Sequence, residues 1–428
     1  MLTKKEYATL DAIYKHRVTT SAQLGFLANL ARGNDEPSQT SVGRWLRNLN
    51  QQGLVSYQRR DTSEKLWSIT AAGVKALRRD SGAYGIPVAR YEKQSWQISV
   101  CERSVTHHLH LNAMAISLIA ALREIPGVTY EDEFDRQPSV AVRPDAIITI
   151  PGEVVDADGR TYSKTILYLE SDMRTERKKA IDTKMSRYRA YFTSSSFDTT
   201  ARHIIVFFCC DDTVNFNPFS LDEAVPSLDN KLKDAHHAAI KQTILSNIGD
   251  LLSSQIEAFV GSTRNVFCAL CAFLSTNESK PGKLVQYLSA DSLNLTVSLP
   301  KREFSRYTAW IEYPEFRKNF LVLDYCHERV GHFNLVLNHR NLTAGLRQYN
   351  RDDVILLIVL PNINSAELVA SSCGLREYPH NDIMLSTEAA LKNPGDVPFR
   401  QRMFKATADG MVMYNDAMTS FVRVEIST

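Results

Sequence analysis

The stretch that decides the fold reads RPDAIITI at residues 143–150, TILYLESD at 165–172 and KMSRYRAYF at 184–192. The first two segments are rich in β-branched and other apolar residues, which predicts two β-strands. Between them stands the pair Asp158-Gly159, a strong signal for a tight hairpin turn. The third segment belongs to a basic amphipathic pattern that is typical of a helix. The sequence therefore predicts a β-hairpin followed directly by a helix.

Three acidic side chains are expected to meet at the open end of this hairpin. A two-residue turn would place Asp145 opposite Asp172, and Glu170 would lie diagonally on the same face because alternate strand residues point the same way. Carboxylates in such proximity repel one another unless a cation lies among them. A small set of hard oxygen ligands suits Mg²⁺ or Mn²⁺. Asp145, Glu170 and Asp172 are therefore the predicted metal ligands and catalytic acids.

The helix after the hairpin carries the opposite charge. Between residues 174 and 189, seven Lys or Arg residues accompany two acidic ones. Lys184 lies about 60° around the helix from Ile181 in the apolar stripe, so this lysine could reach the acids. Acids, a metal ion, a lysine and a basic face together indicate phosphodiester hydrolysis. Each feature taken alone would also fit a solvated strand edge or a solvated helix face. The residues expected to contact DNA phosphates include Arg174, Lys178 and Arg187.

In this order the motifs resemble the PD-(D/E)XK nuclease fold. They resemble more closely the plasmid replication-relaxation family, which includes the MOBC-type conjugative relaxases. The resemblance rests on RPDA, on YLESD followed by RTE, and on KMSRYRAYF, and it covers roughly residues 1–210. It implies that Asp145 is the motif aspartate and Glu170 the first motif acid. The usual lysine position, two residues further, holds Asp172. The resemblance therefore nominates Lys184 on the helix, with Lys164 as the fallback.

A histidine-rich helix is expected upstream, from about residue 105 to 123. His108-Leu109-His110 matches the His-hydrophobe-His signature of tyrosine-using nickases, but residues two apart do not share a face of a helix. The resemblance also takes in His107, which aligns with a helix histidine of the family. His107 is thereby expected beside the metal ligands or on a phosphate, with a satisfied buried histidine as the alternative.

Residues 1–82 are predicted to form a winged helix-turn-helix that binds DNA. Residues 1–80 contain thirteen Lys or Arg against seven Asp or Glu. Three helical patterns are followed by two short strand patterns around a polar turn, which is the order of this fold. A protein-interaction role is the alternative. The residues of the third helix and the wing that suit contacts to phosphates and bases are Gln39, Thr40, Arg44, Arg47, Arg59, Arg60 and Lys65.

The remaining chain divides into a connector at 83–104, a nuclease core at 105–215 and a further α/β region at 216–428. The expected fold class is mixed α+β, with a PD-(D/E)XK-like α/β domain built on a mixed sheet. In the last region Leu323-Asp324 matches Leu169-Glu170 within a similar strand, helix and strand rhythm. This region is either a degenerate copy of the nuclease unit or another α/β subdomain.

Composition points to a cytoplasmic protein. No signal-peptide pattern opens the sequence, and no apolar run reaches the ~18 residues that span a bilayer. Seven scattered cysteines predict no disulfide framework, and the CxxC at 268–271 is expected in a core. A net charge of +2 does not identify a partner by itself.

The leading hypothesis is a metal-dependent DNA endonuclease of the relaxase type, which nicks one strand at a plasmid origin of transfer without a covalent tyrosine intermediate. With 17 tyrosines in the chain, a covalent route stays open. One alternative is a non-catalytic DNA-binding regulator of replication or transcription, favoured by Asp172 in the lysine position. Another is a restriction-type double-strand endonuclease. The resemblance implies three partners: DNA, an accessory mobilisation protein and a type IV secretion coupling protein.

Overall fold

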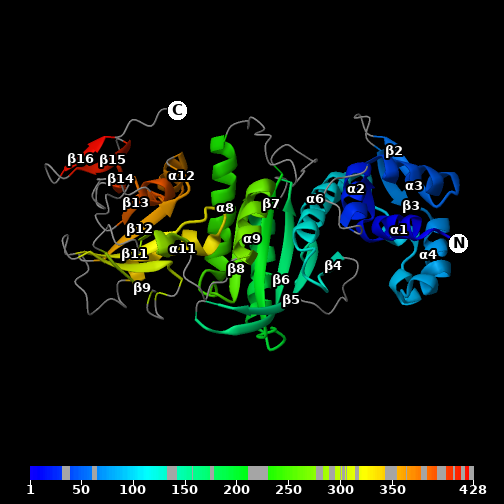
Figure 1. The fold of residues 1–428 in the computed structure, drawn as a ribbon, viewed down its shortest axis with the longest axis horizontal. Helices are drawn as coiled ribbons and strands as arrows, with labels where there is room; N and C mark the ends of the chain where they lie inside the picture. Colours follow the sequence, from blue (N-terminus) through cyan, green and yellow to red (C-terminus); the bar gives the residue numbers. More distant parts are fainter. Residues whose placement is uncertain are drawn as a thin grey trace.

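The described part of the chain contains three β-sheets that follow one another along the molecule (Figure 1). They have three, five and eight strands, and helices accompany each of them, so the fold is mixed α+β. The computed structural model describes residues 1–30, 39–59, 65–132, 142–156, 158–173, 178–210, 230–275, 283–288, 295–298, 300, 304, 306–313, 318–342, 354–362, 364–376, 383–392, 402–407, 410–415 and 420–423.

The N-terminal unit packs helices on a small antiparallel sheet with strand order β1-β3-β2. In α3, Val42, Leu46 and Leu49 are buried because a spacing of three and four residues puts them on one face. A capping box between Thr3 and Glu6 begins α1. The elements are α1 (Lys4–His16), β1 (Val18–Thr20), α2 (Ser21–Leu30), α3 (Gln39–Gln51), β2 (Val55–Arg59), β3 (Lys65–Ile69) and α4 (Ala71–Asp80).

Residues 83–104, expected to be a connector, contribute to the core of this N-terminal unit. Tyr91 is fully buried at the end of a short 3-10 helix, Val88–Tyr91, and its hydroxyl bonds to the Tyr7 hydroxyl at 2.9 Å. Ile98, in α5 (Ser95–Ile98), belongs to the same core cluster. The connector is therefore packed on the first unit.

The central unit is built on a mixed sheet with strand order β4-β5-β6-β7-β8. The pairs β4–β5 and β5–β6 are antiparallel, whereas β6–β7 and β7–β8 are parallel. Helices α6 and α9 cover one face, and α7 and α8 cover the other. The elements are α6 (Val105–Ala121), β4 (Thr129–Asp132), β5 (Ala146–Val155), β6 (Thr161–Asp172), α7 (Lys178–Phe192), β7 (Ala201–Cys209), α8 (Asn230–Ile248), β8 (Ile256–Ser262) and α9 (Thr263–Ser275).

The predicted hairpin forms, but its register differs by two residues from the prediction. Ala146 pairs with Leu169, whereas a turn centred between residues 158 and 159 would pair it with Ser171. The difference has two sources. Val155 pairs with Thr161, so the centre of the loop lies at residue 158 and not between residues 158 and 159. The pairing then shifts again at an irregularity between Pro151 and Val154. A shift of two keeps every side chain on its predicted face but moves Asp145 away from the position opposite Asp172.

The C-terminal sheet has strand order β16-β15-β14-β13-β12-β11-β10-β9. Its strands β9 to β13 repeat the directions of β4 to β8, with two antiparallel pairs followed by two parallel ones. The elements are α10 (Lys283–Leu288), β9 (Thr296–Ser298), β10 (Ala309–Tyr313), β11 (Lys318–Asp324), α11 (Val330–Leu342), β12 (Val354–Leu360), α12 (Asn364–Ser372), β13 (Ile383–Thr387), α13 (Glu388–Lys392), β14 (Phe404–Thr407), β15 (Gly410–Asn415) and β16 (Ser420–Arg423).

The match of Leu323-Asp324 to Leu169-Glu170 is wrong by one residue. Thr308 N–H donates to the Val322 carbonyl, and Thr308 Oγ1 accepts from Asp324 N–H at 2.8 Å. In the central unit, Asp145 N–H donates to the Leu169 carbonyl, and Asp145 Oδ2 accepts from Ser171 N–H. By this correspondence, the C-terminal unit has Thr308 where the central unit has Asp145, Leu323 in place of Glu170, and Tyr325 in place of Asp172.

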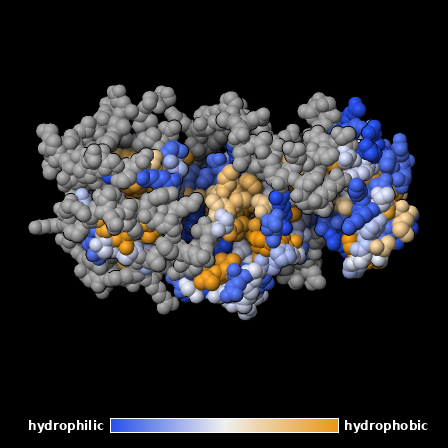
Figure 2. All heavy atoms as spheres, viewed as in Figure 1, coloured by the Kyte–Doolittle hydropathy of each residue, from blue (hydrophilic) through white to orange (hydrophobic). Residues whose placement is uncertain are grey.

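Helix α9 carries apolar side chains on its outer side. Figure 2 shows apolar residues gathered near the middle of this face of the molecule, where α9 lies in Figure 1. Cys268 is exposed and Cys271 half-buried, so the expectation of two core cysteines is wrong for Cys268. Among the described helices, none is long and apolar enough to cross a bilayer.

Replacing Gly73 with alanine tests the packing of α4 on the N-terminal sheet. A Cβ at this position would lie 2.2 Å from the Leu54 carbonyl oxygen and 2.7 Å from Ile69 Cγ1. Gly73→Ala should lower the free energy of unfolding by about 1–3 kcal/mol, as overpacking does. At Gly82 a Cβ meets no atom within 4 Å, so Gly82→Ala is the matched control. Equal stabilities of the two variants in denaturant titrations would contradict the packing described here.

Candidate active site

Glu170 lies near the carboxyl end of β6 with its carboxylate directed at helix α7. The residue is 1% exposed. Lys184 Nζ donates to Oε2 at 2.9 Å, and the Tyr188 hydroxyl donates to Oε1 at 2.7 Å. The two donors are four residues apart, so they lie on one face of α7. The predicted approach of Lys184 to this acid is confirmed.

Asp145 stands just before β5 and is held beside Glu170 by the backbone. Its N–H donates to the Leu169 carbonyl at 3.0 Å, and its Oδ2 accepts from Ser171 N–H at 2.7 Å. His107 Nε2, from α6, lies 3.5 Å from the same Oδ2. The expectation that His107 lies beside a predicted metal ligand is thereby confirmed.

The two carboxyl groups titrate in opposite directions. Burial, together with the nearby Asp145 carboxylate, raises the pKa of Glu170 to about 7, although the charge of Lys184 opposes this rise. Burial also opposes ionisation of Asp145, but the His107 hydrogen bond and the charge of Lys184 outweigh it and lower the pKa of this group. Asp145 is thus an ionised acid at neutral pH, and Glu170 is poised between its two forms.

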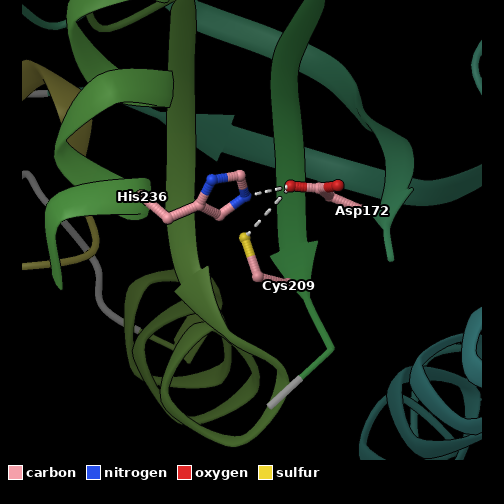
Figure 3. A group of neighbouring side chains, drawn as sticks. All are labelled: Asp172, Cys209 and His236. Carbon is pink, nitrogen blue, oxygen red and sulfur yellow. Dashed lines mark hydrogen bonds and ion pairs between the residues drawn. The ribbon is translucent and has the colours of Figure 1, made fainter. Parts of the chain in front are cut away.

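Asp172 does not join this pair. Its carboxylate is buried and lies 2.6 Å from His236 Nε2 of α8, while Cys209 Sγ of β7 donates to it at 3.8 Å (Figure 3). Within the described part of the chain, the cluster of three potential metal ligands with all ligand atoms within 4.8 Å is Asp172, Cys209 and His236. The prediction that three carboxylates converge is therefore wrong for Asp172, which lies with Cys209 and His236.

The other two histidines of α6 have separate partners. His110 bonds to Ser171 Oγ at 2.8 Å and to Thr263 Oγ1 at 2.6 Å. His108 lies 3.2 Å from Arg17 Nη1. Burial lowers the pKa of His108 to about 3 and of His110 to about 4, so both are neutral. They do not form a shared ligand pair, which agrees with the helical reading of this segment.

The fallback lysine lies away from the acids. Lys164 Nζ is 2.9 Å from Asp198 Oδ2, and Lys164 pairs with Ala201 at the start of β7, whereas Glu170 pairs with Phe207. A distance of six residues along β6 separates the two positions, about 20 Å of strand. Of the two candidate lysines, Lys184 is therefore the one that contacts Glu170.

The residues expected to contact DNA are mostly exposed where they are described. Arg44, Arg47 and Arg59 are exposed, as are Lys178 and Arg187 on α7. Lys65 lies over the ring of Tyr57, with Nζ 4.2 Å from its centroid. The side chains of Gln39 and Thr40, and the whole of Arg60 and Arg174, lie outside the described residues.

Four groups make contacts at these positions that the sequence analysis does not predict. Tyr188 donates to Glu170, and its spacing of four from Lys184 is the signal that indicates a common face of α7. The backbone N–H of Ser171 has no sequence signal. Cys209 is the last residue of β7, and His236 lies on α8. No local spacing in the sequence connects these two residues.

Comparison with known proteins bears on this part of the chain. Residues 10–206 match the family model described as replication-relaxation. The matched segment therefore includes most of the N-terminal unit, the hairpin, α7 and most of β7, and with them Asp145, Glu170 and Lys184. Helix α8 and the C-terminal sheet lie beyond it.

Other comparisons add no functional argument. No curated protein matches the chain. A solved structure, the central domain of yeast acetyl-CoA carboxylase, matches with 8% identity and a TM-score of 0.23, over 94% of this chain and 65% of that one. A TM-score this low does not relate the two folds.

The pKa of Glu170 can be tested through the pH dependence of stability. Its folded-state value of about 7 exceeds the ordinary value of 4.5, so the folded protein keeps a proton that the unfolded chain loses between these two pH values. In the absence of metal, the stability of the wild type relative to Glu170→Gln should be highest below pH 4.5 and fall as pH rises to about 7. Denaturant titrations of both proteins across this range measure the difference. A constant or rising difference would contradict the assignment.

Proposed function

We propose that this protein is a metal-dependent DNA endonuclease, a relaxase that nicks one strand at a plasmid origin of transfer. The observation that carries the proposal is the meeting of Asp145, Glu170 and Lys184 on one end of the central sheet. All three lie in the segment that matches the replication-relaxation model, which suggests a role in plasmid replication or mobilisation.

The proposal includes a finer reading of the two folded units. The proposed winged helix-turn-helix is supported by the order α1-β1-α2-α3-β2-β3 and by the antiparallel three-stranded sheet. The proposed PD-(D/E)XK-like core would consist of helix α6, the β4–β5–β6 meander, helix α7 and strand β7. In this reading the first unit binds duplex DNA through α3 and the wing, and the second holds the scissile strand.

The acid pair suits Mg²⁺ or Mn²⁺. Asp145 and Glu170 offer only carboxylate oxygens, which hard divalent ions prefer. The lowered pKa of Asp145 makes it an ionised ligand, and a cation would favour the ionised form of buried Glu170. When bound, such an ion would supply activated water and stabilise charge on the phosphate. Asp172, held by His236, is not included in this ligand pair.

The protein's own groups position the reaction. Lys184 Nζ can leave one oxygen of Glu170 for the scissile phosphate, where its charge stabilises the charge that develops. The Tyr188 hydroxyl keeps the other oxygen in place, and His107 and the Ser171 N–H orient Asp145. Exposed Lys178 and Arg187 on the same helix are placed to contact neighbouring phosphates.

The proposed partners follow from the proposed role. They are origin DNA in duplex and nicked form, an accessory mobilisation protein and a type IV secretion coupling protein, with the cytoplasm as the site of action. The C-terminal unit we take to be a degenerate copy of the nuclease unit. It repeats the strand directions but has Thr308, Leu323 and Tyr325 where the acids stand.

A non-catalytic regulator of plasmid replication or transcription is the second candidate. It is favoured by one observation: both oxygens of Glu170 are already hydrogen-bonded, as in a structural ion pair. In that case the same fold would bind DNA but hold no metal at the acid pair.

Nicking of supercoiled origin DNA tests the proposed chemistry. With Mg²⁺ or Mn²⁺ the full chain should produce open circles without protein attached to the 5′ end. Asp145→Asn, Glu170→Gln and Lys184→Ala should each slow the reaction by about 10²–10³-fold, as removal of a charge-stabilising group does. Lys164→Ala, a lysine in an ion pair elsewhere on β6, is the matched control and should be unaffected.

Each other outcome of this assay contradicts part of the proposal. Cleavage that survives the double substitution Asp145→Asn and Glu170→Gln excludes the acid pair. Binding without cleavage supports the regulator, and a linear product supports a double-strand endonuclease. A covalent 5′ adduct contradicts direct hydrolysis.

DNA binding by the N-terminal unit has its own test. The double variant Arg44→Ala and Arg47→Ala removes two exposed cations from α3. Affinity for duplex DNA should fall, and the slope of log affinity against log salt should decrease by about 2, one for each lost phosphate contact. Arg123→Ala, two residues after the end of α6 and beside Glu124, is the control. An unchanged salt slope in the double variant would place DNA elsewhere.

A further inference from the structure

The geometry of Asp172, Cys209 and His236 points to a second metal site, which we propose binds Zn²⁺. The three side chains come from β6, β7 and α8 and converge on one point (Figure 3). The site does not depend on the nuclease proposal, because none of its ligands belongs to the Asp145–Glu170 pair.

The ligand set selects the kind of ion. A thiolate, an imidazole and a carboxylate are together the ligands of Zn²⁺, whereas Mg²⁺ and Mn²⁺ prefer oxygen alone. The Asp145–Glu170 pair therefore suits a hard ion such as Mg²⁺, whereas the cluster of Asp172, Cys209 and His236 suits Zn²⁺. Glu170 and Asp172 are two residues apart on the same strand. Three protein ligands leave a fourth position for water, as in zinc sites that remain open.

The backbone places two of the ligands without any adjustment. Strands β6 and β7 are parallel, and Asp172 and Cys209 are registered neighbours at their last positions. Their side chains therefore leave the sheet on the same face, at the carboxyl ends where ligands of α/β sheets commonly bind. His236, in the second turn of α8, faces them from the helix that covers this face.

The distances are close to those that a zinc ion requires. Bonds of about 2.0–2.3 Å in a tetrahedral site separate the ligand atoms by roughly 3.3–3.8 Å. Cys209 Sγ and Asp172 Oδ2 are already 3.8 Å apart. His236 Nε2 and Asp172 Oδ2 are 2.6 Å apart, a hydrogen-bond distance that must open slightly. The His236 side chain is 26% exposed, so it has room to do so.

Burial gives a reason for the ion. Asp172 is 2% exposed and Cys209 is fully buried, and the Cys209 thiol donates to the carboxylate. Once that thiol loses its proton, a carboxylate next to a thiolate in such surroundings needs a positive charge. A divalent cation supplies it and releases the thiol proton on binding. The bound ion would also fasten the end of β6, where Ser171 holds both Asp145 and His110.

Metal binding by the chelator-treated full chain tests this site. One equivalent of Zn²⁺ should remain bound after gel filtration, and Co²⁺ in its place should give a thiolate-to-cobalt charge-transfer band. Cys209→Ser should abolish that band, and His236→Gln, at a partly exposed position, should weaken Co²⁺ affinity at least tenfold. Cys268→Ser, which alters an exposed cysteine on α9, is the matched control and should leave the band intact. Excess Mg²⁺ should not displace the ion.

Three results would overturn the proposal. They are a folded wild type that retains no Zn²⁺, a Co²⁺ spectrum unchanged in both Cys209→Ser and His236→Gln, and displacement of Co²⁺ by Mg²⁺. Nicking activity enters none of these measurements, so the zinc site and the nuclease can fail separately.

Discussion

The buried carboxylate of Glu170 is the constraint on which the central unit depends. An acid without solvent is stable only with hydrogen-bond donors or a cation, and here α7 supplies both through Tyr188 and Lys184. These contacts join α7 to β6, and the apolar stripe of the helix packs on the same face of the sheet around them. Its basic residues then face outward. The charge pattern of the helix and the burial of one acid are thus parts of a single arrangement.

The C-terminal unit shows that this backbone does not need the acids. Thr308 makes the same pair of contacts to the neighbouring strand as Asp145, with a hydroxyl in place of a carboxylate. Leu323 packs in a hydrophobic cluster at the position of Glu170. The strand directions are nevertheless those of the central sheet. The strand directions therefore do not require the acidic residues, and function has to be argued from the site.

Local patterns predicted much of this structure, and distant contacts account for the errors. The hairpin, the helix and the approach of Lys184 to Glu170 follow from periodicity within about fifty residues. The predicted register of the hairpin differs from the observed one because a turn signal specifies neither the centre of a loop nor an irregularity such as that between Pro151 and Val154. The predicted register places Asp172 with the other two acids, and no local pattern reveals that its partner is His236, 64 residues further along the chain.

Crystals grown with Mn²⁺ give the most direct test of the central claim, since the ion is visible by its anomalous scattering. The account predicts a peak between the carboxylates of Asp145 and Glu170, with Lys184 still within reach of the latter, and loss of that peak in Asp145→Asn crystals. A peak confined to Asp172, Cys209 and His236, or the absence of any peak at the acid pair in well-ordered crystals, would contradict it.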